Sequence, residues 1–230
     1  MYNNASQSFL PYRTKYYSID VEAVATGYDH NSRSVAQISL IDQNEQVHLN
    51  MYVHQSTSVV SYLTALTGLT KATLDAYGIP LDQALATLRA NLPNDAILVG
   101  QNIRKDIEWL GLREGVDFES LVDLAGLYRC WNTKYSSWSV FGQDHVAKVL
   151  LGWESGPGAG SHDAVRDAIK SMRLFNYYHQ LQSTPGAWEG AQRVLMDTQP
   201  EPSFARLNPV YEGVCMGNRK TCSCGAPFFS

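Results

Sequence analysis

Polar and apolar side chains alternate in K-Y-Y-S-I-D-V-E, residues 15–22, and this segment is the starting point for the fold of the chain. Alternation with a period of two is the pattern of a β-strand with one face in the core. Residues two apart on a strand point to the same side, so Asp20 and Glu22 are expected on one face of the sheet. Taken alone, this pair also fits an exposed strand face with solvated acids.

More strands and several helices are expected after this stretch. The run S-V-A-Q-I-S-L-I-D (34–42) alternates cleanly, and a polar turn leads from it into a third strand over 46–53. Pro80 begins a helix, and the wholly apolar run A-I-L-V-G (96–100) predicts a buried central strand. Helical patterns follow over 104–110, 121–130, 139–151 and 161–182. Strands first and helices later predict a mixed α/β domain.

The bulk composition fits one globular core with a small appendage. The chain has 230 residues, of which 44% are hydrophobic and 17% charged, and this excludes a disordered protein. The net charge of -4 argues against binding nucleic acid by bulk electrostatics, but not against gripping a strand end locally. No apolar run has signal-peptide or membrane-spanning length, so we expect an intracellular protein, cytoplasmic or nuclear, without membrane contact.

Three regions are expected along the chain: a flexible lead over 1–14, a main domain over 15–182, and a C-terminal tail over 183–230. The tail holds five of the nine prolines and three of the four cysteines, with little periodicity. Cys215, Cys222 and Cys224 are clustered, and thiolates in a reducing compartment suggest a structural zinc ion. The candidates for its fourth ligand in the main domain are Cys130, His145 and His179. The alternative is that the tail cysteines bind no metal.

A third acid follows the apolar central strand. In V-G-Q-N-I-R-K-D (99–106), Asp106 comes six residues after the strand and starts a predicted helix. Open α/β sheets bind ligands at the ends of such strands. The alternative is a first-turn acid that only complements the helix dipole.

The last pair of candidates lies in S-H-D-A-V-R-D (161–167), where His162 precedes Asp167 by five residues. On one continuous helix these side chains would point about 140° apart. We therefore expect His162 at the edge of the preceding glycine-rich loop and Asp167 in the early turns of the helix. A surface histidine near a helix start is the alternative.

Four carboxylates and one histidine suit a particular chemistry. Carboxylate oxygens are hard ligands that favour Mg²⁺ or Mn²⁺ over zinc. Two such ions about 4 Å apart can clamp the attacking and leaving oxygens of a phosphodiester. A histidine with a pKa of about 6.5 can take a proton from the attacking water at neutral pH.

These motifs resemble those of the DEDDh family of 3′–5′ exonucleases, which have a ribonuclease H-like fold. The matching segments are D-V-E-A-V-A-T-G (20–27), V-G-Q-N-I-R-K-D-I-E-W-L (99–110) and H-D-A-V-R-D-A (162–168). The layout is similar to the branch with RNA exonuclease 4 and the interferon-induced exonucleases, through S-V-A-Q-I-S-L-I-D, T-G-L-T (67–70) and D-L-A-G-L (123–127). The resemblance covers residues 15–178. It implies a ribonuclease H-like mixed sheet with flanking helices.

The resemblance also implies roles for single residues. Asp20 would bridge two metal ions, Glu22 and Asp167 would hold the first, and Asp106 would hold the second through water. His162 would be the general base, and nucleoside 5′-monophosphates would leave from the 3′ end.

The same resemblance points to a binding site for the terminal nucleotide. The backbone and side chains of the segment that holds Ala23, Val24 and Gly27 would cradle this nucleotide, and Leu69 would wedge against the last bases. The sequence departs from the family at Ala23, where a methionine is common, and at Gln101, where a histidine is frequent. Both departures concern substrate preference, because neither removes a ligand.

Asn102, Arg104 and Lys105 complete the candidate substrate contacts, with a solvated helix face as the alternative for the two bases. Trp109, Trp131, Trp138 and Trp153 are expected to pack in the core, and to stack on bases only if exposed. The expected partner is single-stranded nucleic acid with a free 3′ end, RNA before DNA, and no pattern fixes an oligomeric state. The alternatives are a catalytically silent nucleic-acid or protein-binding module and a scavenger of short RNAs.

Overall fold

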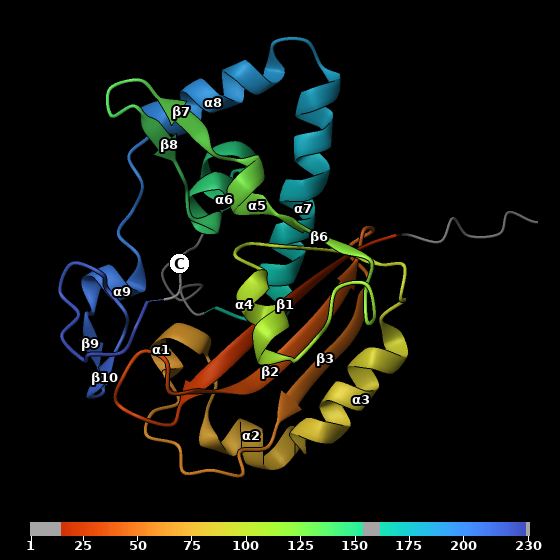
Figure 1. The fold of residues 1–230 in the computed structure, drawn as a ribbon, viewed down its shortest axis with the longest axis vertical. Coiled ribbons are helices and arrows are strands. Elements are labelled where there is room, and N and C mark those ends of the chain that lie inside the picture. The colour runs from red at the N-terminus through yellow and green to blue at the C-terminus, as the bar shows by residue number, and fades with distance from the viewer. Residues whose placement is uncertain (1–14, 154–161, 229–230) are drawn as a thin grey trace, which may run out of the picture.

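A mixed β-sheet forms the centre of the computed structural model, which describes residues 15–153 and 162–228 (Figure 1). Within these residues, six strands pair in the order β4-β3-β2-β1-β5-β6. Their bounds are β1 Tyr16–Ala25, β2 Arg33–Asp42, β3 Val47–Val53, β4 Gly78–Ile79, β5 Ile97–Gly100 and β6 Ser120–Asp123. The strands β1, β2 and β3 form an antiparallel meander, whereas β5 and β6 run parallel to β1. The predicted mixed sheet is confirmed.

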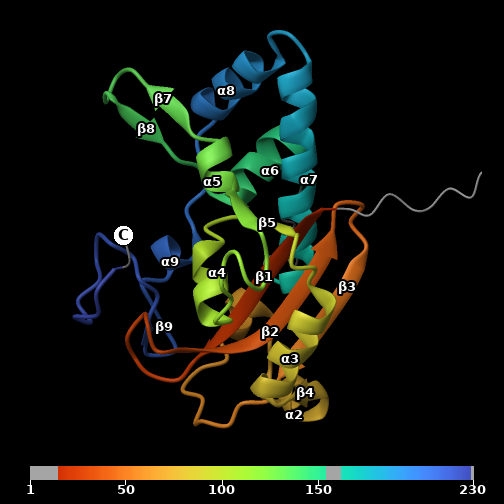
Figure 2. The ribbon, with the colours of Figure 1, turned by 45° about the vertical axis from the view of Figure 1, so that its right-hand side comes forward.

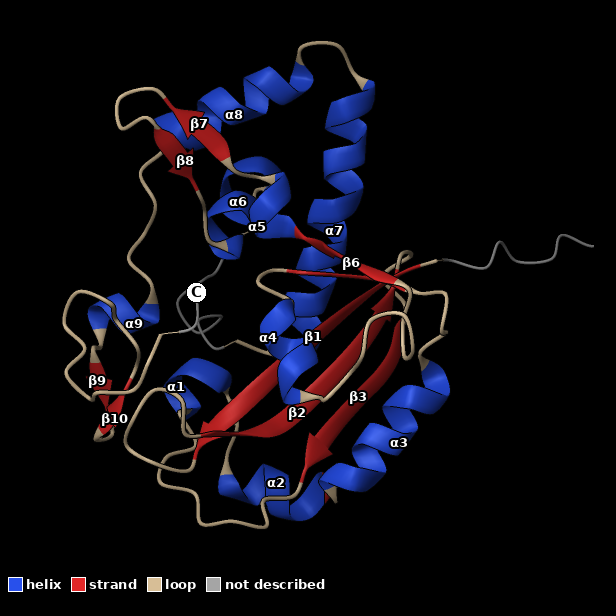
Figure 3. Cartoon of the chain, in the orientation of Figure 1, coloured by secondary structure: helices blue, strands red, loops and turns tan. Residues whose placement is uncertain are grey.

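Helices surround this sheet and extend beyond one end of it (Figure 3). In the described residues they are α1 Thr64–Thr67, α2 Lys71–Tyr77, α3 Leu81–Asn91, α4 Arg104–Trp109, α5 Leu124–Leu127, α6 Gln143–Leu151, α7 Ala164–Ser183, α8 Ala187–Asp197 and α9 Phe204–Leu207. None of the helices in the described part of the chain is both long and apolar enough to cross a lipid bilayer.

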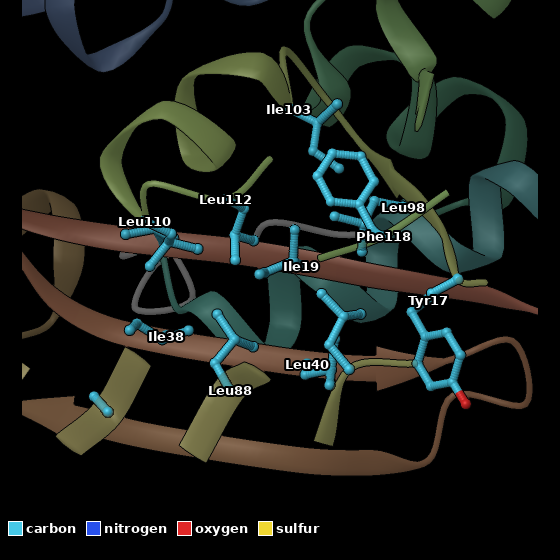
Figure 4. Packing of buried hydrophobic residues seen from close by; sticks show 14 of the residues in the cluster. Tyr17, Ile19, Ile38, Leu40, Leu88, Leu98, Ile103, Leu110, Leu112 and Phe118 are labelled. Carbon is cyan, nitrogen blue, oxygen red and sulfur yellow. The ribbon is translucent and has the colours of Figure 1, made fainter. Parts of the chain in front are cut away.

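One face of the sheet carries the larger hydrophobic cluster (Figure 4). Alternate residues of β1 and β2, among them Ile19 and Ile38, pack there against Leu88 of α3 and Leu110 after α4. The period of two that the sequence shows therefore sends every second side chain of these strands into this core. The residues between them point to the opposite face.

Helix α7 covers that opposite face, and polar side chains of β2 fix its start. The Ser39 hydroxyl donates to the Ala164 carbonyl at 2.6 Å, and the Gln37 amide donates to Asp163 Oδ2 at 3.2 Å. Both β2 side chains are fully buried. Buried polar groups require such partners, so these bonds fix where the helix begins relative to the sheet.

The structure differs from the sequence prediction over residues 121–130. That range was expected to be helical, but Ser120–Asp123 is a strand and α5 covers only Leu124–Leu127. The strand pairs in parallel with β5, from Ile97 opposite Ser120 to Gly100 opposite Asp123. Pairing with a strand about twenty residues away thus overrides a local helical pattern.

The tail also starts differently from its prediction. Residues 183–230 were expected to leave the core, yet α8 packs beside α6 and α7, and Leu195 is fully buried with Val146 and Met172. The irregular part begins after Asp197, and it contains α9 and the short pair β9 (Val210–Tyr211) and β10 (Val214–Cys215). A second small pair, β7 (Cys130–Asn132) and β8 (Ser137–Ser139), projects beside α8 (Figure 2).

Candidate active site

Four carboxylates from three separate segments meet on the α7 side of the sheet. Asp20 and Glu22 extend from β1, Asp106 lies in the first turn of α4, and Asp167 lies in the first turn of α7. The charges of the other three carboxylates all act on Asp20. The structure therefore brings together the predicted acids, although Asp20 and Asp167 are 147 positions apart in the sequence.

The position of Asp106 follows from the length of β5. This strand pairs with β1 only as far as Ser18 opposite Val99. The backbone of β1 beyond that point needs another partner, and Val21 N–H donates to Asp106 Oδ1 at 3.1 Å. The carboxylate of α4 is thereby fixed beside Asp20 and Glu22.

His162 lies just outside α7, as the five-residue spacing predicts. Asp163 caps the helix by accepting from Arg166 N–H at 3.0 Å, so His162 precedes the first turn. Its Nδ1 lies 2.7 Å from Asp167 Oδ2, and its backbone N–H donates to the Leu66 carbonyl. Ligand atoms of Glu22, His162 and Asp167 all lie within 4.8 Å of one another. The glycine-rich loop before His162 lies outside the described residues.

Lys170 is a site residue that the sequence analysis missed. Its Nζ lies 2.7 Å from Asp167 Oδ1 and 2.6 Å from Asp144 Oδ1, and the side chain is buried. A lysine three positions after an acid in a helix lies on the same face, so this spacing was a usable signal. With His162 on one oxygen and Lys170 on the other, Asp167 is held in one orientation.

The carboxyl groups strongly perturb one another. Burial, then the charges of Asp106 and Asp167, raises the pKa of Asp20 well above its usual value. Burial raises the pKa of Glu22 to about 8 and that of Asp106 to about 7. Burial also acts to raise the pKa of Asp167, but the His162 hydrogen bond and the Lys170 charge outweigh it and lower this pKa.

The pKa of His162 is raised above that of a free imidazole. Its hydrogen bond to Asp167 raises the pKa of His162 to about 9. At neutral pH and without a cation, His162 is therefore protonated, and the pKa of about 6.5 expected from the sequence does not apply to this state.

The donor set fits divalent cations of the hard class. Four ionised carboxylates would carry more negative charge than Lys170 and His162 offset, and burial together with this repulsion raises the pKa values of Asp20 and Glu22. Oxygen ligands of this kind suit Mg²⁺ or Mn²⁺, and a cation among them removes the repulsion. Asp20, Glu22, Asp106 and Asp167 are the residues that would hold such ions.

Several predicted substrate contacts lie near this cluster. Asn102 has a positive φ of 53°, and its N–H donates to Asp123 Oδ1 at 3.0 Å. Arg104 and Lys105 are exposed on the same short helix as Asp106, and Lys105 Nζ lies 4.8 Å from the centre of the Trp109 ring. Their exposure leaves both bases accessible to a phosphate.

The segment after Glu22 is less accessible than expected. The Ala23 side chain is buried, and a β-bulge separates it from Glu22. Gly27 approaches Ser32 so closely that a Cβ atom would lie 2.7 Å from Ser32 Cβ, which explains the glycine.

Two residues predicted to contact the nucleotide have buried side chains. The side chains of Val24 and Leu69 pack together in one cluster with Ala36 and Leu74, and Leu69 is only 3% exposed. An apolar side chain in this position stabilises the fold, so neither residue offers its side chain to a nucleotide.

The prediction that the tryptophans pack in the core is wrong for two of them. Trp131 and Trp138 are 50% and 49% exposed, opposite each other on the β7–β8 hairpin. Their ring centroids are 5.4 Å apart, and the Arg129 guanidinium lies 4.5 Å from the Trp138 ring centre. The hairpin thus presents aromatic rings and a cation to solvent.

The three tail cysteines also come together, but with a different histidine from those expected. Cys215, Cys222 and Cys224 surround His30, in the loop after β1. The predicted fourth ligands lie elsewhere: Cys130 is buried beside Tyr128, His145 Nε2 faces the Leu195 carbonyl, and His179 packs on Phe175. No spacing in the sequence links His30 to the tail.

Curated proteins with similar sequences are RNA exonucleases and related nucleases. RNA exonuclease 4 of Neurospora crassa is 30% identical over 167 residues, and small RNA degrading nuclease 2 of Arabidopsis thaliana is 27% identical over 172. RNA exonuclease 5 of Homo sapiens is 27% identical over 168 residues. The matches cover 70%, 71% and 70% of this chain but 38%, 34% and 20% of those proteins, respectively. No protein-family model matches the chain.

Solved structures establish the fold. The Pan2 catalytic unit of Neurospora crassa, with protease and nuclease domains, gives a TM-score of 0.67 at 16% identity, over 84% of this chain and 31% of that one. A Saccharomyces cerevisiae Pan2 module in complex with AAUUAA RNA gives 0.67 at 17% identity, over 82% of this chain and 33% of that one. The expected ribonuclease H-like fold is thereby confirmed.

Proposed function

We propose that this chain, a homologue of proteins named RNA exonuclease 4 and 5, is a metal-dependent 3′–5′ exonuclease that hydrolyses single-stranded RNA. The observation that carries the proposal is the meeting of Asp20, Glu22, Asp106 and Asp167 beside His162. A binding module has no need for four carboxylates that repel one another in a buried site. A nuclease has that need, because the same groups hold divalent cations.

Two Mg²⁺ or Mn²⁺ ions, held by the four carboxylates, would supply Lewis-acid stabilisation of the charge that develops on the phosphodiester oxygens. Asp20 lies centrally, since the charges of the other three carboxylates all act on it. This supports the role of a bridging ligand for Asp20. Asp106 keeps one oxygen on the Val21 N–H, which holds the side chain in place for binding.

His162 is the proposed general base, and Asp167 orients it. With Nδ1 donating to Asp167 Oδ2, the opposite ring nitrogen, Nε2, is the atom that takes the proton from the attacking water. The hydrogen bond to Asp167 and the charges of Asp167 and Glu22 raise the pKa of His162, and cations held by these carboxylates would offset that effect. The imidazole can then lose its proton near neutral pH and act as a base.

Arg104 and Lys105 are proposed to contact the phosphates near the cleaved bond, since both are exposed on the helix that carries Asp106. The Trp131–Trp138 pair is proposed as a stacking surface for bases further along the strand. The RNA preference draws on the names of the relatives, and DNA is the competing polymer. An intracellular location, cytoplasmic or nuclear, stays a prediction.

Matched RNA and DNA oligomers of one sequence, labelled at the 5′ end, test this function. They are incubated with the full chain and Mg²⁺ or Mn²⁺, beside Asp20→Asn and the control Asp82→Asn, which changes an acid of α3 outside the site. We expect a ladder that shortens from the 3′ end and nucleoside 5′-monophosphates, both lost in Asp20→Asn alone. A circular RNA of the same sequence should stay intact, because it has no end.

Other outcomes of the same assay identify the alternatives. If the folded, metal-loaded chain binds the oligomer but shortens neither polymer, it is a binding module and the exonuclease proposal fails. If it degrades only oligomers of a few nucleotides, it is a scavenger of short RNAs. Cleavage of the circular substrate would mean an endonuclease.

A further inference from the structure

Four metal-binding side chains meet where the C-terminal segment crosses the loop between β1 and β2. His30 comes from this loop, and Cys215, Cys222 and Cys224 come from the end of the chain. Their ligand atoms, Nδ1 or Nε2 of the histidine and Sγ of each cysteine, all lie within 4.8 Å of one another. Two segments thus supply one compact set of ligand atoms, although His30 and Cys215 are 185 positions apart in the sequence.

The spacing of these atoms agrees with a tetrahedral site. Cys222 Sγ lies 3.5 Å from Cys215 Sγ, 3.5 Å from Cys224 Sγ and 3.7 Å from His30 Nδ1. His30 Nδ1 lies 3.1 Å from Cys224 Sγ. Zn–S bonds of about 2.3 Å and Zn–N bonds of about 2.0 Å at tetrahedral angles separate two sulfurs by about 3.8 Å and a sulfur from a nitrogen by about 3.5 Å. The two sulfur–sulfur distances are slightly shorter than the expected value, and the two sulfur–nitrogen distances lie on either side of theirs, all within a few tenths of an ångström.

The surroundings of His30 are those of a metal ligand. With Nδ1 toward the cysteines, Nε2 lies 3.2 Å from the Pro227 carbonyl, the kind of partner that holds the ring of a ligating histidine. The Phe228 ring stacks on His30 at 4.3 Å. Gly217 has a φ of +71°, and a Cβ there would lie 3.3 Å from His30 Cβ. The chain is therefore built to pass closely over this histidine.

The C-terminal segment has few other means of holding its fold. Its strands β9 and β10 have two residues each, and most of its side chains after Thr198 are exposed. Val214 packs fully buried against Ala25 and Leu63, and Tyr211 and Met216 pack partly buried against the same small cluster. A segment with so little core gains stability when a metal ion closes it.

We propose that His30, Cys215, Cys222 and Cys224 bind one structural zinc ion, which joins the C-terminal segment to the β1–β2 loop. Three thiolates and one imidazole in a tetrahedral arrangement form a closed site of the structural class, with no position left for substrate. Cys215 N–H donates to the Tyr28 carbonyl at 2.8 Å, and Arg33 donates to the Cys215 carbonyl at 3.0 Å. These backbone contacts fix the loop that follows the strand of Asp20 and Glu22. The zinc inference is independent of the proposed function.

Metal analysis of the full chain tests this site. The protein is produced with added zinc and purified with a thiol reductant, and its zinc content is measured by inductively coupled plasma mass spectrometry. We expect about one zinc ion per chain in the wild type and in Cys130→Ser, which removes the buried cysteine outside the cluster. Cys222→Ser and His30→Ala should lose most of the zinc.

A conservative variant separates a ligand from a residue that merely supports the fold. His30→Cys replaces the nitrogen with a sulfur and should keep zinc as a four-cysteine site, whereas a residue needed only for packing would not allow this rescue. Cobalt(II) bound in place of zinc should give thiolate charge-transfer absorption that Cys222→Ser reduces. The inference fails if the reduced wild type holds less than about a fifth of an equivalent of zinc, if Cys222→Ser retains full zinc, or if Cys215 and Cys222 form a disulfide.

Discussion

Lys170 Nζ lies 2.7 Å from Asp167 Oδ1, one helical turn further along α7. Both side chains are buried, so this is an ion pair inside the protein and not a surface contact. The burial that would lower the pKa of Lys170 is outweighed by the charge of Asp167 and the hydrogen bond of Asp144, which raise it. Lys170 therefore stays charged and offsets part of the repulsion among the carboxylates.

Loss of this lysine should destabilise the fold. In Lys170→Met the long side chain remains but the charge is gone, which leaves Asp167 with His162 as its single cationic partner. Removal of one member of a buried pair costs about 3–5 kcal/mol, and we expect a loss near the lower value in urea unfolding. The control is Lys148→Met, which breaks an exposed pair with Glu201 and should change stability by less than about 1 kcal/mol. Equal losses in the two variants would contradict the assignment.

Removal of the proposed base should slow hydrolysis without weakening RNA binding. For His162→Ala we expect kcat to fall by about 10²–10⁴-fold, the range for loss of a general base, with KM changed little. His54→Ala, which removes an exposed histidine outside the site, should match the wild type. The measurement is steady-state release of nucleotide from a labelled RNA. If both variants keep full activity, another group takes the proton.

The cation-free protein should lose stability as pH rises from 5 to 9. The folded-state pKa values of Glu22, Asp106 and His162 are raised to about 8, 7 and 9. The folded state thus binds more protons than the unfolded state across this window, and that stability is lost as pH rises through each folded pKa. Each kcal/mol lost lowers Tm by about 2–4 °C for a chain of this size.

Thermal unfolding at several pH values measures this effect, after dialysis into buffer without Mg²⁺ and without a chelator. Added Mg²⁺ should raise Tm more at pH 8 than at pH 5.5, because the repulsion that it relieves is larger there. Glu22→Gln should flatten the pH dependence. A Tm that rises with pH in the Mg²⁺-free protein would contradict the charge arrangement.

The exposed tryptophan pair should contribute to RNA binding. Each stacked base is worth about 1–3 kcal/mol, so the double variant Trp131→Ala/Trp138→Ala should weaken binding by about 5–150-fold. Fluorescence anisotropy with labelled single-stranded RNA, in an Asp20→Asn background that prevents cleavage, gives Kd. Tyr77→Ala removes an exposed aromatic ring of α2 as the control and should leave Kd unchanged. Unchanged affinity in the double variant would remove the hairpin from the binding surface.

Periodicity correctly predicted those strands and helices in which apolar and polar residues repeat with the period of the element. The alternation over 34–42 marks β2, and the five-residue spacing places His162 outside α7 with Asp167 inside it. The same approach failed at Ser120–Asp123, because Leu121 and Leu124 are spaced as in a helix. The strand forms there because β5 offers backbone partners, and no local pattern reports a partner of that kind.

The other differences between prediction and structure concern which side chains are buried. The family resemblance implied that Leu69 contacts the last bases, yet its contacts with Val24 and Leu74 place its side chain in the core. Trp131 and Trp138 are hydrophobic, yet the hairpin that carries them leaves about half of each side chain exposed. Hydrophobicity gives the average tendency of a residue, whereas exposure depends on which elements pack over it.

The family resemblance linked the four acids into one candidate site, and periodicity predicted their places on their elements, because a strand repeats every two residues and a helix every 3.6. These periods place Asp20 with Glu22 on one face and Asp167 in a first turn before any tertiary contact is known. Only the packing of the chain brings Lys170 to Asp144, and His30 to the tail cysteines. Those contacts join segments whose separation follows no period, so they exist only once the chain has packed.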